Sequence, residues 1–353
     1  MHIFFWQRPP ALGAASRPIY GVNLGGWLLL EKWMTPSLFA GTRAEDEYSL
    51  CSIGSRAIKQ RLQKHRDTFI TRDDFVWLQQ HGLQAVRLPV GYWLFDGDPP
   101  YVAAAEYVDK AFGWASETNI KILLDFHGAP GSQNGHDHSG RKGACTWHTE
   151  EANIAASLRV IEKLADTYGK HPALLGIELL NEPLSTIPRQ TLQDFYEKAY
   201  RIIRERCTTD AWIVFSDGFK PRKWKRVLRQ PDYTDTYIDS HQYQIFEQRD
   251  KRLDIAGHIH KTLRNVIGEI HGMQRYHPAI IGEWSIALDP LSMSGLTAQQ
   301  KEQATRAYAA AQLIAYEHSA AWFYWSYKTE KGGTWSYRDC VDTGRLPAGY
   351  QKD

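Results

Sequence analysis

The sequence is poor in cysteine and contains no long apolar run. Only 4 of its 353 residues are cysteine, at positions 51, 145, 207 and 340. This spacing provides no CxxC zinc motif and no dense disulfide framework of the kind found in small secreted domains. No apolar stretch reaches the roughly 20 residues of a membrane-spanning helix. We therefore expect four free thiols and no transmembrane segment.

The chain also lacks an excess of charge of either sign. It has 42 Lys and Arg against 40 Asp and Glu, a net charge of +2, whereas nucleic-acid binders carry a strong basic excess. The apolar stretch at residues 3–6 is too short for a signal-peptide core. This slightly favours a cytoplasmic location, and a secreted one would follow if a leader had been removed. Aromatic residues are plentiful at 12%, which suits either an aromatic core or ligand-stacking faces.

Short apolar runs alternate with segments of helical periodicity along most of the chain. The predicted strands are residues 21–26, 85–90, 121–127, 174–181, 212–217, 237–241, 279–283 and 321–326. The predicted helices are residues 73–81, 101–118, 151–168, 190–207, 251–276 and 297–317. Strands that are apolar throughout are typical of parallel sheets buried on both faces. The alternation predicts an α/β fold, either a (β/α)8 barrel or a doubly wound sheet.

No repeat, low-complexity tract or linker divides the sequence. We expect an N-terminal extension at residues 1–20 and a single catalytic domain at residues 21–353. A barrel needs only about 250 residues, so the remainder predicts enlarged βα loops. These loops are long after the first, third, sixth and eighth predicted strands.

Polar residues end most of the predicted strands. They are Asn23, Arg87, Asp125, His127, Asn181, Glu182, His241, Tyr243, Glu283 and Trp325. Charged groups in an apolar strand are costly unless they are paired, and a barrel carries its active site at the carboxyl ends of its strands. So many polar residues at one end predict a catalytic site there.

Two glutamates stand out within this set. Glu182 and Glu283 each follow an apolar run and precede a turn, on the fourth and seventh predicted strands. Two carboxylates about 5–5.5 Å apart can hydrolyse a glycosidic bond with retention, one as the acid/base and the other as the nucleophile. Burial and repulsion between like charges can hold their pKa values apart.

Other chemistries are poorly represented. His136, Asp137 and His138 could ligate a metal together with His127, but histidines in a glycine-rich loop are more often solvated or hydrogen-bonded. The sequence contains no GxxxxGK[ST] phosphate loop, no GxGxxG fingerprint after a strand and no GxSxG nucleophile elbow. We therefore expect no metal and no cofactor.

Longer motifs surround these residues. They are NEP at 181–183, IGEW at 281–284, RLPVGYW at 87–93, LDFHGAPGSQNG at 124–135, DSHQYQIF at 239–246 and WSYKTE at 325–330. This ordered set resembles the retaining glycosidases of glycoside hydrolase family 5, which are (β/α)8 barrels. The resemblance covers residues 21–337 and implies that Glu182 is the acid/base and Glu283 the nucleophile.

Within that family the chain is most similar to the exo-β-1,3-glucanases, which share GVNLGGWLLLEKWMTPSLF at residues 21–39. This similarity implies a sugar pocket formed by Glu31, Arg87, His127, His136, Asp137, Asn181, His241, Tyr243, Phe246 and Trp325. Trp325 would be the sugar platform, and Phe246 matches one aromatic of a clamp beyond the cleavage point. His136 stands where the family often has the other, a phenylalanine.

The expected function is hydrolysis of β-glucans or β-glucosides with retention, by an exo-acting β-1,3-glucanase. A β-1,6-glucan, a small aryl or lipid glucoside, transglycosylation, or a non-catalytic carbohydrate-binding barrel are the alternatives. The expected partner is a β-glucan or gluco-oligosaccharide, not a nucleic acid, and the chain is expected to be a monomer.

Overall fold

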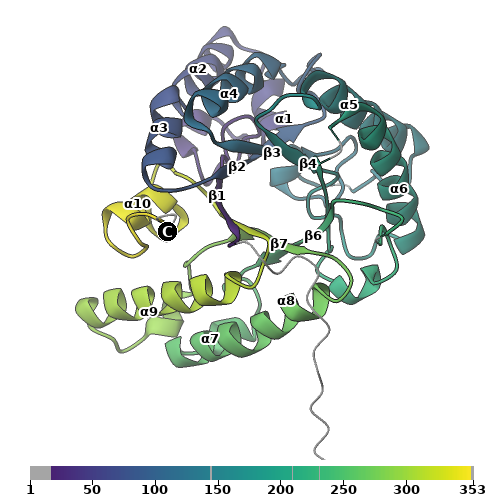
Figure 1. Cartoon of the computed structure of the whole chain (residues 1–353). Coiled ribbons are helices and arrows are strands. Elements are labelled where there is room, and N and C mark those ends of the chain that lie inside the picture. The colour runs from purple at the N-terminus through teal and green to yellow at the C-terminus, as the bar shows by residue number, and fades with distance from the viewer. Residues whose placement is uncertain (1–16, 144, 209, 230, 351–353) are drawn as a thin grey trace, which may run out of the picture.

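The computed structural model describes residues 17–350 except 144, 209 and 230, and its eight parallel strands close into a barrel (Figure 1). The strands are β1 Ile19–Asn23, β2 Ala85–Gly91, β3 Lys121–Gly128, β4 Leu174–Glu178, β5 Trp212–Ser216, β6 Thr236–Gln242, β7 Ala279–Trp284 and β8 Ala321–Tyr324. Each strand pairs with the next in sequence, and β8 pairs with β1. The predicted α/β class is confirmed, and the barrel prevails over the doubly wound sheet.

The barrel is filled by side chains rather than hollow. Inward-facing residues from six strands form one buried cluster: Ala85, Leu123, Leu175, Val214, Ile280, Ala321 and Phe323. Gly21 on β1 faces this cluster, and a Cβ there would lie 2.5 Å from the ring of Phe323. The small residue therefore makes room for the large one across the barrel, as close packing of an interior requires.

Helices surround the barrel and bury their apolar faces on it (Figure 1). They are α3 Arg72–Gln80, α4 Ala105–Thr118, α5 Glu151–Tyr168, α6 Arg189–Arg206, α7 Ile255–Lys261, α8 Ile267–Met273 and α9 Ala298–Tyr316, with a π-helical turn Thr262–Val266 joining α7 to α8. All six predicted helices are present. α9 begins with a reciprocal capping box between Thr297 and Gln300, which satisfies two backbone N–H groups of the first turn.

Three helices were not predicted: α1 Glu47–Ser52, α2 Arg56–Thr68 and α10 Tyr337–Asp342. β1 begins at residue 19, so the last two residues of the predicted N-terminal extension belong to the barrel. Residues 1–16 lie outside the described residues, and the domain boundary stays a prediction. β1 ends at Asn23 rather than at residue 26, because the chain turns at Gly26 with φ +72°.

The fourth strand is shorter than predicted, which corrects the position of Asn181 and Glu182. β4 pairs with both neighbours only as far as Glu178. Beyond it, the Leu179 N–H donates to β5 and the Asn181 N–H donates to β3, so the two pairings separate. Asn181 and Glu182 therefore lie in the loop after the strand, not at its end.

Long loops cover the carboxyl end of the barrel, as predicted, and three of them are joined to one another. The Tyr48 N–H donates to the Gly140 carbonyl, and the Lys142 N–H donates to Asp46 Oδ2 at 2.7 Å. On the other side, the Glu330 N–H donates to the Met34 carbonyl. The loop after β1 is thus tied both to the loop after β3 and to the loop after β8.

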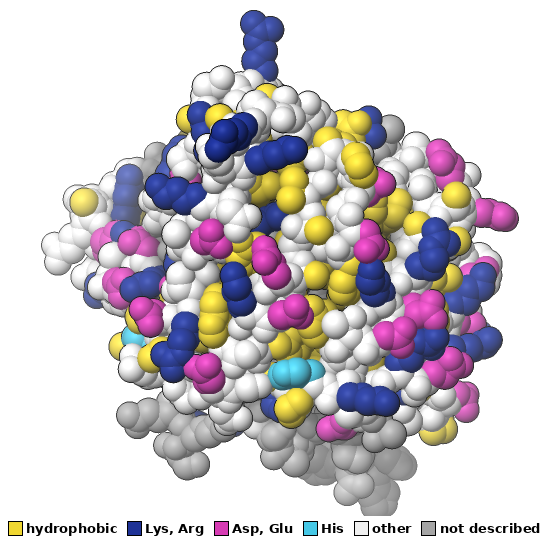
Figure 2. Space-filling model, turned by 90° about the horizontal axis from the view of Figure 1, so that it is seen from above, with side chains coloured by type: hydrophobic (Ala, Val, Ile, Leu, Met, Phe, Trp, Pro, Cys, Tyr) yellow, Lys and Arg dark blue, Asp and Glu magenta, His cyan; other side chains and the backbone are white. Residues whose placement is uncertain are grey.

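The cysteines, the helices and the surface charges agree with the expectations from composition. All four cysteines are free. None of the helices that the structure describes is long and apolar enough to cross a membrane. On the face of the molecule shown in Figure 2, basic and acidic side chains are interspersed rather than segregated by sign. This pattern agrees with the balanced net charge.

Candidate active site

Arg87 lies at the centre of the polar network at the carboxyl end of the barrel. It is completely buried on β2. Its guanidinium donates from Nε to Glu178 Oε2 at 2.7 Å, from Nη2 to Asn181 Oδ1 at 2.8 Å and from Nη1 to Glu283 Oε1 at 3.0 Å. A planar guanidinium can orient several acceptors at once. Arg87 therefore fixes Asn181 and Glu283 relative to each other.

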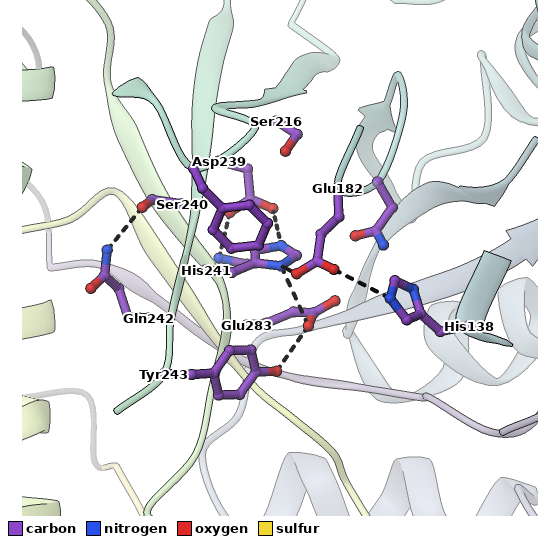
Figure 3. A network of polar contacts seen from close by, with 12 residues as sticks. His138, Glu182, Ser216, Asp239, Ser240, His241, Gln242, Tyr243 and Glu283 are labelled. Carbon is purple, nitrogen blue, oxygen red and sulfur yellow. Dashed lines mark hydrogen bonds and ion pairs between the residues drawn. The ribbon is translucent and has the colours of Figure 1, made fainter. Parts of the chain in front are cut away.

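Glu283 receives a second donor from the loop after β6. The hydroxyl of Tyr243 donates to Glu283 Oε2 at 2.8 Å (Figure 3). Burial raises the pKa of Glu283, and the positive charges of His241 and Arg87 oppose this rise. Both Arg87 and Tyr243 bond the ionised form, which is the form that a nucleophile needs.

Glu182 faces Glu283 across the site. Its backbone has φ +39°, in the left-handed region that non-glycine residues rarely adopt. Asn134 donates to the Glu182 carbonyl at 3.1 Å and holds this turn in place. Strained backbone of this kind is often found at functional sites. The turn directs the side chain back toward His241 and Glu283 (Figure 3).

The separation of the two carboxyl groups distinguishes between mechanisms. One side-chain oxygen of Glu182, one of Glu283 and a ring nitrogen of His241 all lie within 4.8 Å of one another. Retaining glycosidases hold their carboxyl groups about 5–5.5 Å apart, and inverting enzymes about 6.5–9.5 Å apart to admit a water molecule. The close approach of these oxygens agrees with the retaining class.

His241 connects both glutamates to a third carboxylate. Its Nδ1 lies 2.6 Å from Glu182 Oε1 and 3.4 Å from Glu283 Oε2, and its Nε2 donates to Asp239 Oδ2 at 3.2 Å. Burial alone would lower the pKa of His241, but the charges of Glu283 and Asp239 raise it well above its ordinary value. We therefore expect His241 to be protonated on both ring nitrogens and to be positively charged.

The contact with His241 lowers the pKa of Glu182, whereas it raises the pKa of His241. Burial alone would raise the pKa of Glu182, but the hydrogen bond from His241 and the charges of His241 and His138 lower the pKa to about 2. The proton shared by Glu182 and His241 thus resides on the imidazole. It needs to move only along a 2.6 Å contact to reach Glu182.

The site also contains a flat aromatic surface. The Trp325 and His127 rings stack with centroids 5.6 Å apart and planes 12° apart. His127 is oriented by Asp125, which accepts from Nδ1 at 2.5 Å, and by the Asn181 amide, which donates to Nε2 at 3.2 Å. Gly25 makes room for the indole, because a Cβ there would lie 2.9 Å from the Trp325 ring.

Glu31 lies in the loop after β1 and keeps one oxygen free. Trp33 Nε1 donates to Glu31 Oε2 at 2.7 Å, whereas the buried Oε1 has no hydrogen-bond partner among the described residues. Burial raises the pKa of Glu31 well above its usual range, and the negative charges of Asp137, Glu283 and Glu182 raise it further. A buried acceptor without a partner is costly, and a ligand hydroxyl would satisfy it.

The remaining predicted residues lie at the rim. Asp137 begins the short helical turn Asp137–Ser139, and the exposed His136 precedes it. Phe246 is 64% exposed and packs beside Tyr243, with ring centroids 5.4 Å apart. Its ring also lies 6.2 Å from that of Trp335. The binding roles of these rim residues stay predictions.

Three residues of the network were missed as site residues by the sequence analysis. Glu178 and Asp239 lie within strands, where the only signal was a charged residue in an apolar run. Asp239 packs against the glycine that precedes Glu283, and its Oδ1 accepts from the Gly282 N–H at 2.6 Å. His138, considered above only as a metal ligand, contacts Glu182 instead.

Among the residues that the structure describes, two groups of potential metal ligands lie in this network: Glu178 with Asp239 and His241, and Glu182 with His241 and Glu283. Both include His241, whose two ring nitrogens already contact carboxylates. The Arg87 guanidinium supplies positive charge beside Glu178 and Glu283, where a metal would otherwise do so. The residues therefore fit acid–base chemistry better than metal binding, and the absence of a cofactor stays a prediction.

A separate groove of about 1130 Å³ lies on the outer flank of the barrel. It is lined by α7, the π-helical turn and α8, by the chain just before α7 and just after α8, and by the connection from β5 to β6, which contains no α-helix among its described residues. None of the predicted site residues lines this groove. The chemistry-bearing residues gather instead at the carboxyl ends of the strands.

Comparison with known proteins identifies related sequences. The family model described as cellulase (glycosyl hydrolase family 5) matches residues 52–331. A probable glucan 1,3-beta-glucosidase A of Aspergillus fumigatus is 34% identical over 94% of this chain and 87% of its own length. A glucan 1,3-beta-glucosidase of Pichia angusta is 32% identical over 94% of this chain and 86% of its own length.

Solved structures share the barrel at lower sequence identity. The rutinosidase from Aspergillus niger superposes with a TM-score of 0.78 at 21% identity, covering 94% of this chain and 98% of that one. Endo-glycoceramidase II from Rhodococcus sp. gives a TM-score of 0.57 at 16% identity, covering 96% and 77%. At this identity the likeness establishes the fold alone.

Proposed function

Because the chain belongs to glycosyl hydrolase family 5 and is an O-glycosyl hydrolase, we propose that it releases glucose from the non-reducing ends of β-1,3-glucans and their oligosaccharides. Glu182 is the acid/base and Glu283 the nucleophile. The single observation that supports these roles is the approach of one oxygen of Glu182 to within 4.8 Å of one oxygen of Glu283, each carboxyl group having its own set of partners. Arg87 and Tyr243 bond Glu283, and His241 bonds Glu182.

The reaction proceeds in two displacements. Glu283 attacks the anomeric carbon, and the bond to the leaving oxygen breaks as Glu182 donates a proton to that oxygen. Water then attacks the anomeric carbon of the glucosyl-enzyme, Glu182 takes a proton from it, and Glu283 is released as a carboxylate. Glu182 then passes this proton back to His241, so the pair returns to its starting state after each cycle.

His241 supplies the proton for the first step. Its proton lies between Nδ1 and Glu182 Oε1, so the pair delivers one proton through the carboxyl group. Asp239 accepts from Nε2 and stabilises the imidazolium. As the negative charge of Glu283 is consumed in the attack, its support of the imidazolium weakens, and the proton passes to Glu182.

The sugar pocket follows from the same geometry. Trp325 presents a flat face to the apolar side of a pyranose. The unpartnered Glu31 Oε1 accepts a hydrogen bond from a sugar hydroxyl. Arg87 holds Asn181 beside the nucleophile, within reach of the hydroxyl adjacent to the anomeric carbon.

Exo action is supported by the joined loops. The loop after β1 carries Glu31 and is hydrogen-bonded to the loops after β3 and β8. These contacts hold the loop that carries Glu31, and we infer that the joined loops block one end of the site so that a glucan enters by its terminal residue. The proposed monomer is sufficient for this site, because all of the residues named come from one chain.

The decisive experiment is a product analysis. The purified protein is incubated with laminarin and with a linkage panel of glucose disaccharides, beside Glu283→Gln and the exposed control Glu151→Gln. Glucose as the only early product from the β-1,3 substrates, lost in Glu283→Gln and retained in Glu151→Gln, is expected. Longer oligosaccharides among the early products would contradict exo action. Activity on β-1,6 or aryl glucosides alone would contradict the assignment of β-1,3-glucans as the substrate. Normal turnover by Glu283→Gln would refute the catalytic assignment.

A further inference from the structure

The residue that follows Tyr243 is held by a buried polar network on the outer side of its loop. Gln244 lies in the loop after β6 and is buried. Its Oε1 lies 3.0 Å from His258 Nδ1, and its Nε2 donates to Thr262 Oγ1 at 2.7 Å. His258 belongs to α7, and Thr262 begins the π-helical turn that follows α7. Gln244 therefore anchors the loop that carries Tyr243 to the outer layer of helices.

The donors and acceptors of this network have one consistent arrangement. An amide oxygen carries no hydrogen, so His258 Nδ1 donates to Gln244 Oε1. Burial lowers the pKa of His258, so the ring is neutral and its Nε2 accepts from the Ser292 hydroxyl at 2.9 Å. Thr262 Oγ1 accepts from Gln244 and donates to the His258 carbonyl at 2.9 Å. Both the oxygen and the nitrogen of the Gln244 amide thus have a defined partner.

The burial of the network makes it a rigid anchor. His258 and Thr262 are completely buried, and Gln244 and Ser292 are each only 5% exposed. A buried polar group that loses its partner is destabilising, so rotation of the Gln244 amide out of this position is disfavoured. A satisfied buried network also favours a single conformation of the groups around it. The network therefore holds the backbone of the loop at Gln244.

This anchor acts on the neighbouring residue in the chain. Tyr243 reaches into the site, where its hydroxyl donates to Glu283 Oε2 at 2.8 Å (Figure 3), whereas Gln244 reaches the π-helical turn. The Tyr243 ring also contacts Phe246, but Phe246 is 64% exposed and offers little restraint. A shift of the backbone at Gln244 would therefore move the Tyr243 hydroxyl relative to the carboxylate.

We propose that Gln244, held by His258 and Thr262, is a positioning residue that keeps the Tyr243 hydroxyl on Glu283. The inference rests on the proposed function, because it needs Glu283 to be the nucleophile. Gln244 acts through Tyr243 and is not itself a catalytic residue.

Loss of this anchor has a signature in the pH profile. A donor to the ionised form of a carboxyl group favours that form, so a displaced Tyr243 hydroxyl raises the pKa of Glu283. The acid limb of kcat/KM reports protonation of the nucleophile in the free enzyme, and this limb moves upward. A residue that only stabilises the fold would leave the limb in place.

The test uses two variants of the network and a matched control. Gln244→Met keeps the length of the side chain and removes both amide contacts, and Thr262→Val removes the hydroxyl that accepts from Gln244. The control Thr236→Val removes a buried hydroxyl at the opposite end of β6, where Thr236 donates to the Leu228 carbonyl at 2.9 Å. Each change is made in the wild type and in Tyr243→Phe, and kcat/KM for an aryl β-glucoside is measured against pH.

In Gln244→Met we expect the acid limb to rise by about 0.5 pH unit and kcat/KM at neutral pH to fall about fivefold. Thr262→Val removes one of the two contacts, should change both quantities in the same direction by less, and serves as the test if Gln244→Met does not fold. In the Tyr243→Phe background neither change should move the limb further, and kcat/KM should fall by less than about twofold. Thr236→Val should match its parent in both backgrounds.

An unmoved limb in both network variants, or equal losses of kcat/KM with and without the Tyr243 hydroxyl, would overturn the inference. Failure of the proposed function has a different signature, because the wild type would then not hydrolyse the glucoside, or Glu283→Gln would keep normal turnover.

Discussion

Replacing Tyr243 by phenylalanine isolates one hydrogen bond to the nucleophile. The change removes the hydroxyl that donates to Glu283 Oε2 at 2.8 Å. The ring remains, so its packing against Phe246 and Trp335 is retained. Because the lost hydrogen bond stabilises the ionised carboxylate, the pKa of Glu283, which burial already raises, rises further.

The size of the rise in the Glu283 pKa follows from the strength of the hydrogen bond that Tyr243 donates. A hydrogen bond to a charged group contributes about 1.5–3 kcal/mol, and 1.36 kcal/mol corresponds to one pKa unit. The full loss would therefore shift the pKa by about 1–2 units. His241 Nδ1 lies 3.4 Å from the same oxygen and compensates in part. We expect an upward shift of about 1 unit in the Glu283 pKa.

The assay is the acid limb of kcat/KM against pH with an aryl β-glucoside. In a retaining glycosidase this limb reports protonation of the nucleophile in the free enzyme. The control is Tyr237→Phe at the opposite end of β6, where the ring stacks on Trp212 with centroids 3.9 Å apart. An acid limb that stays in place in Tyr243→Phe, with circular dichroism showing an intact fold, would refute the role given to this hydroxyl.

Three further changes test other parts of the account. Arg87→Met leaves buried carboxylates unpaired and should cost about 3–5 kcal/mol of unfolding free energy, measured by urea titration; a loss below about 1 kcal/mol would contradict the network. His65 is buried, and burial lowers its pKa to about 4, so the wild type loses up to about 3 kcal/mol of stability as the pH falls from 6.5 to 4. His65→Gln cannot take up that proton and should flatten the dependence over this window, and an unchanged slope would exclude the assignment. Gly25→Ala displaces Trp325 and should lower kcat/KM about tenfold, equivalent to about 1.4 kcal/mol, in steady-state assays; full activity would show that the indole is not the platform.

Much of the fold could be predicted because the barrel strands are apolar throughout and end on polar residues. Arg87, His127 and Glu283 all lie within the strands predicted for them. The helices α4 to α6 and α9 also follow from periodicity, since each buries one continuous face. By contrast, α1 has only six residues, which is too short for a helical period to be distinguished from a loop.

The parts that could not be predicted depend on contacts between distant segments. Glu178 has no distinctive sequence context, and its role arises only when β2 brings Arg87 to it. The turn at Glu182 requires φ +39°, which no residue in NEP demands by itself. His138 reaches Glu182 because the loop after β3 is tied to Asp46, far away in the sequence.

The most direct measurement of the central claim is chemical trapping of the nucleophile. The protein is treated with a 2-deoxy-2-fluoro-β-glucoside that carries a good leaving group, digested, and examined by peptide mass spectrometry. We expect one fluoroglucosyl adduct on Glu283 in the wild type, and none in Glu283→Gln. An adduct on another carboxylate, or rapid turnover of the reagent to the α-anomer of the product with no adduct, would contradict a retaining mechanism through Glu283.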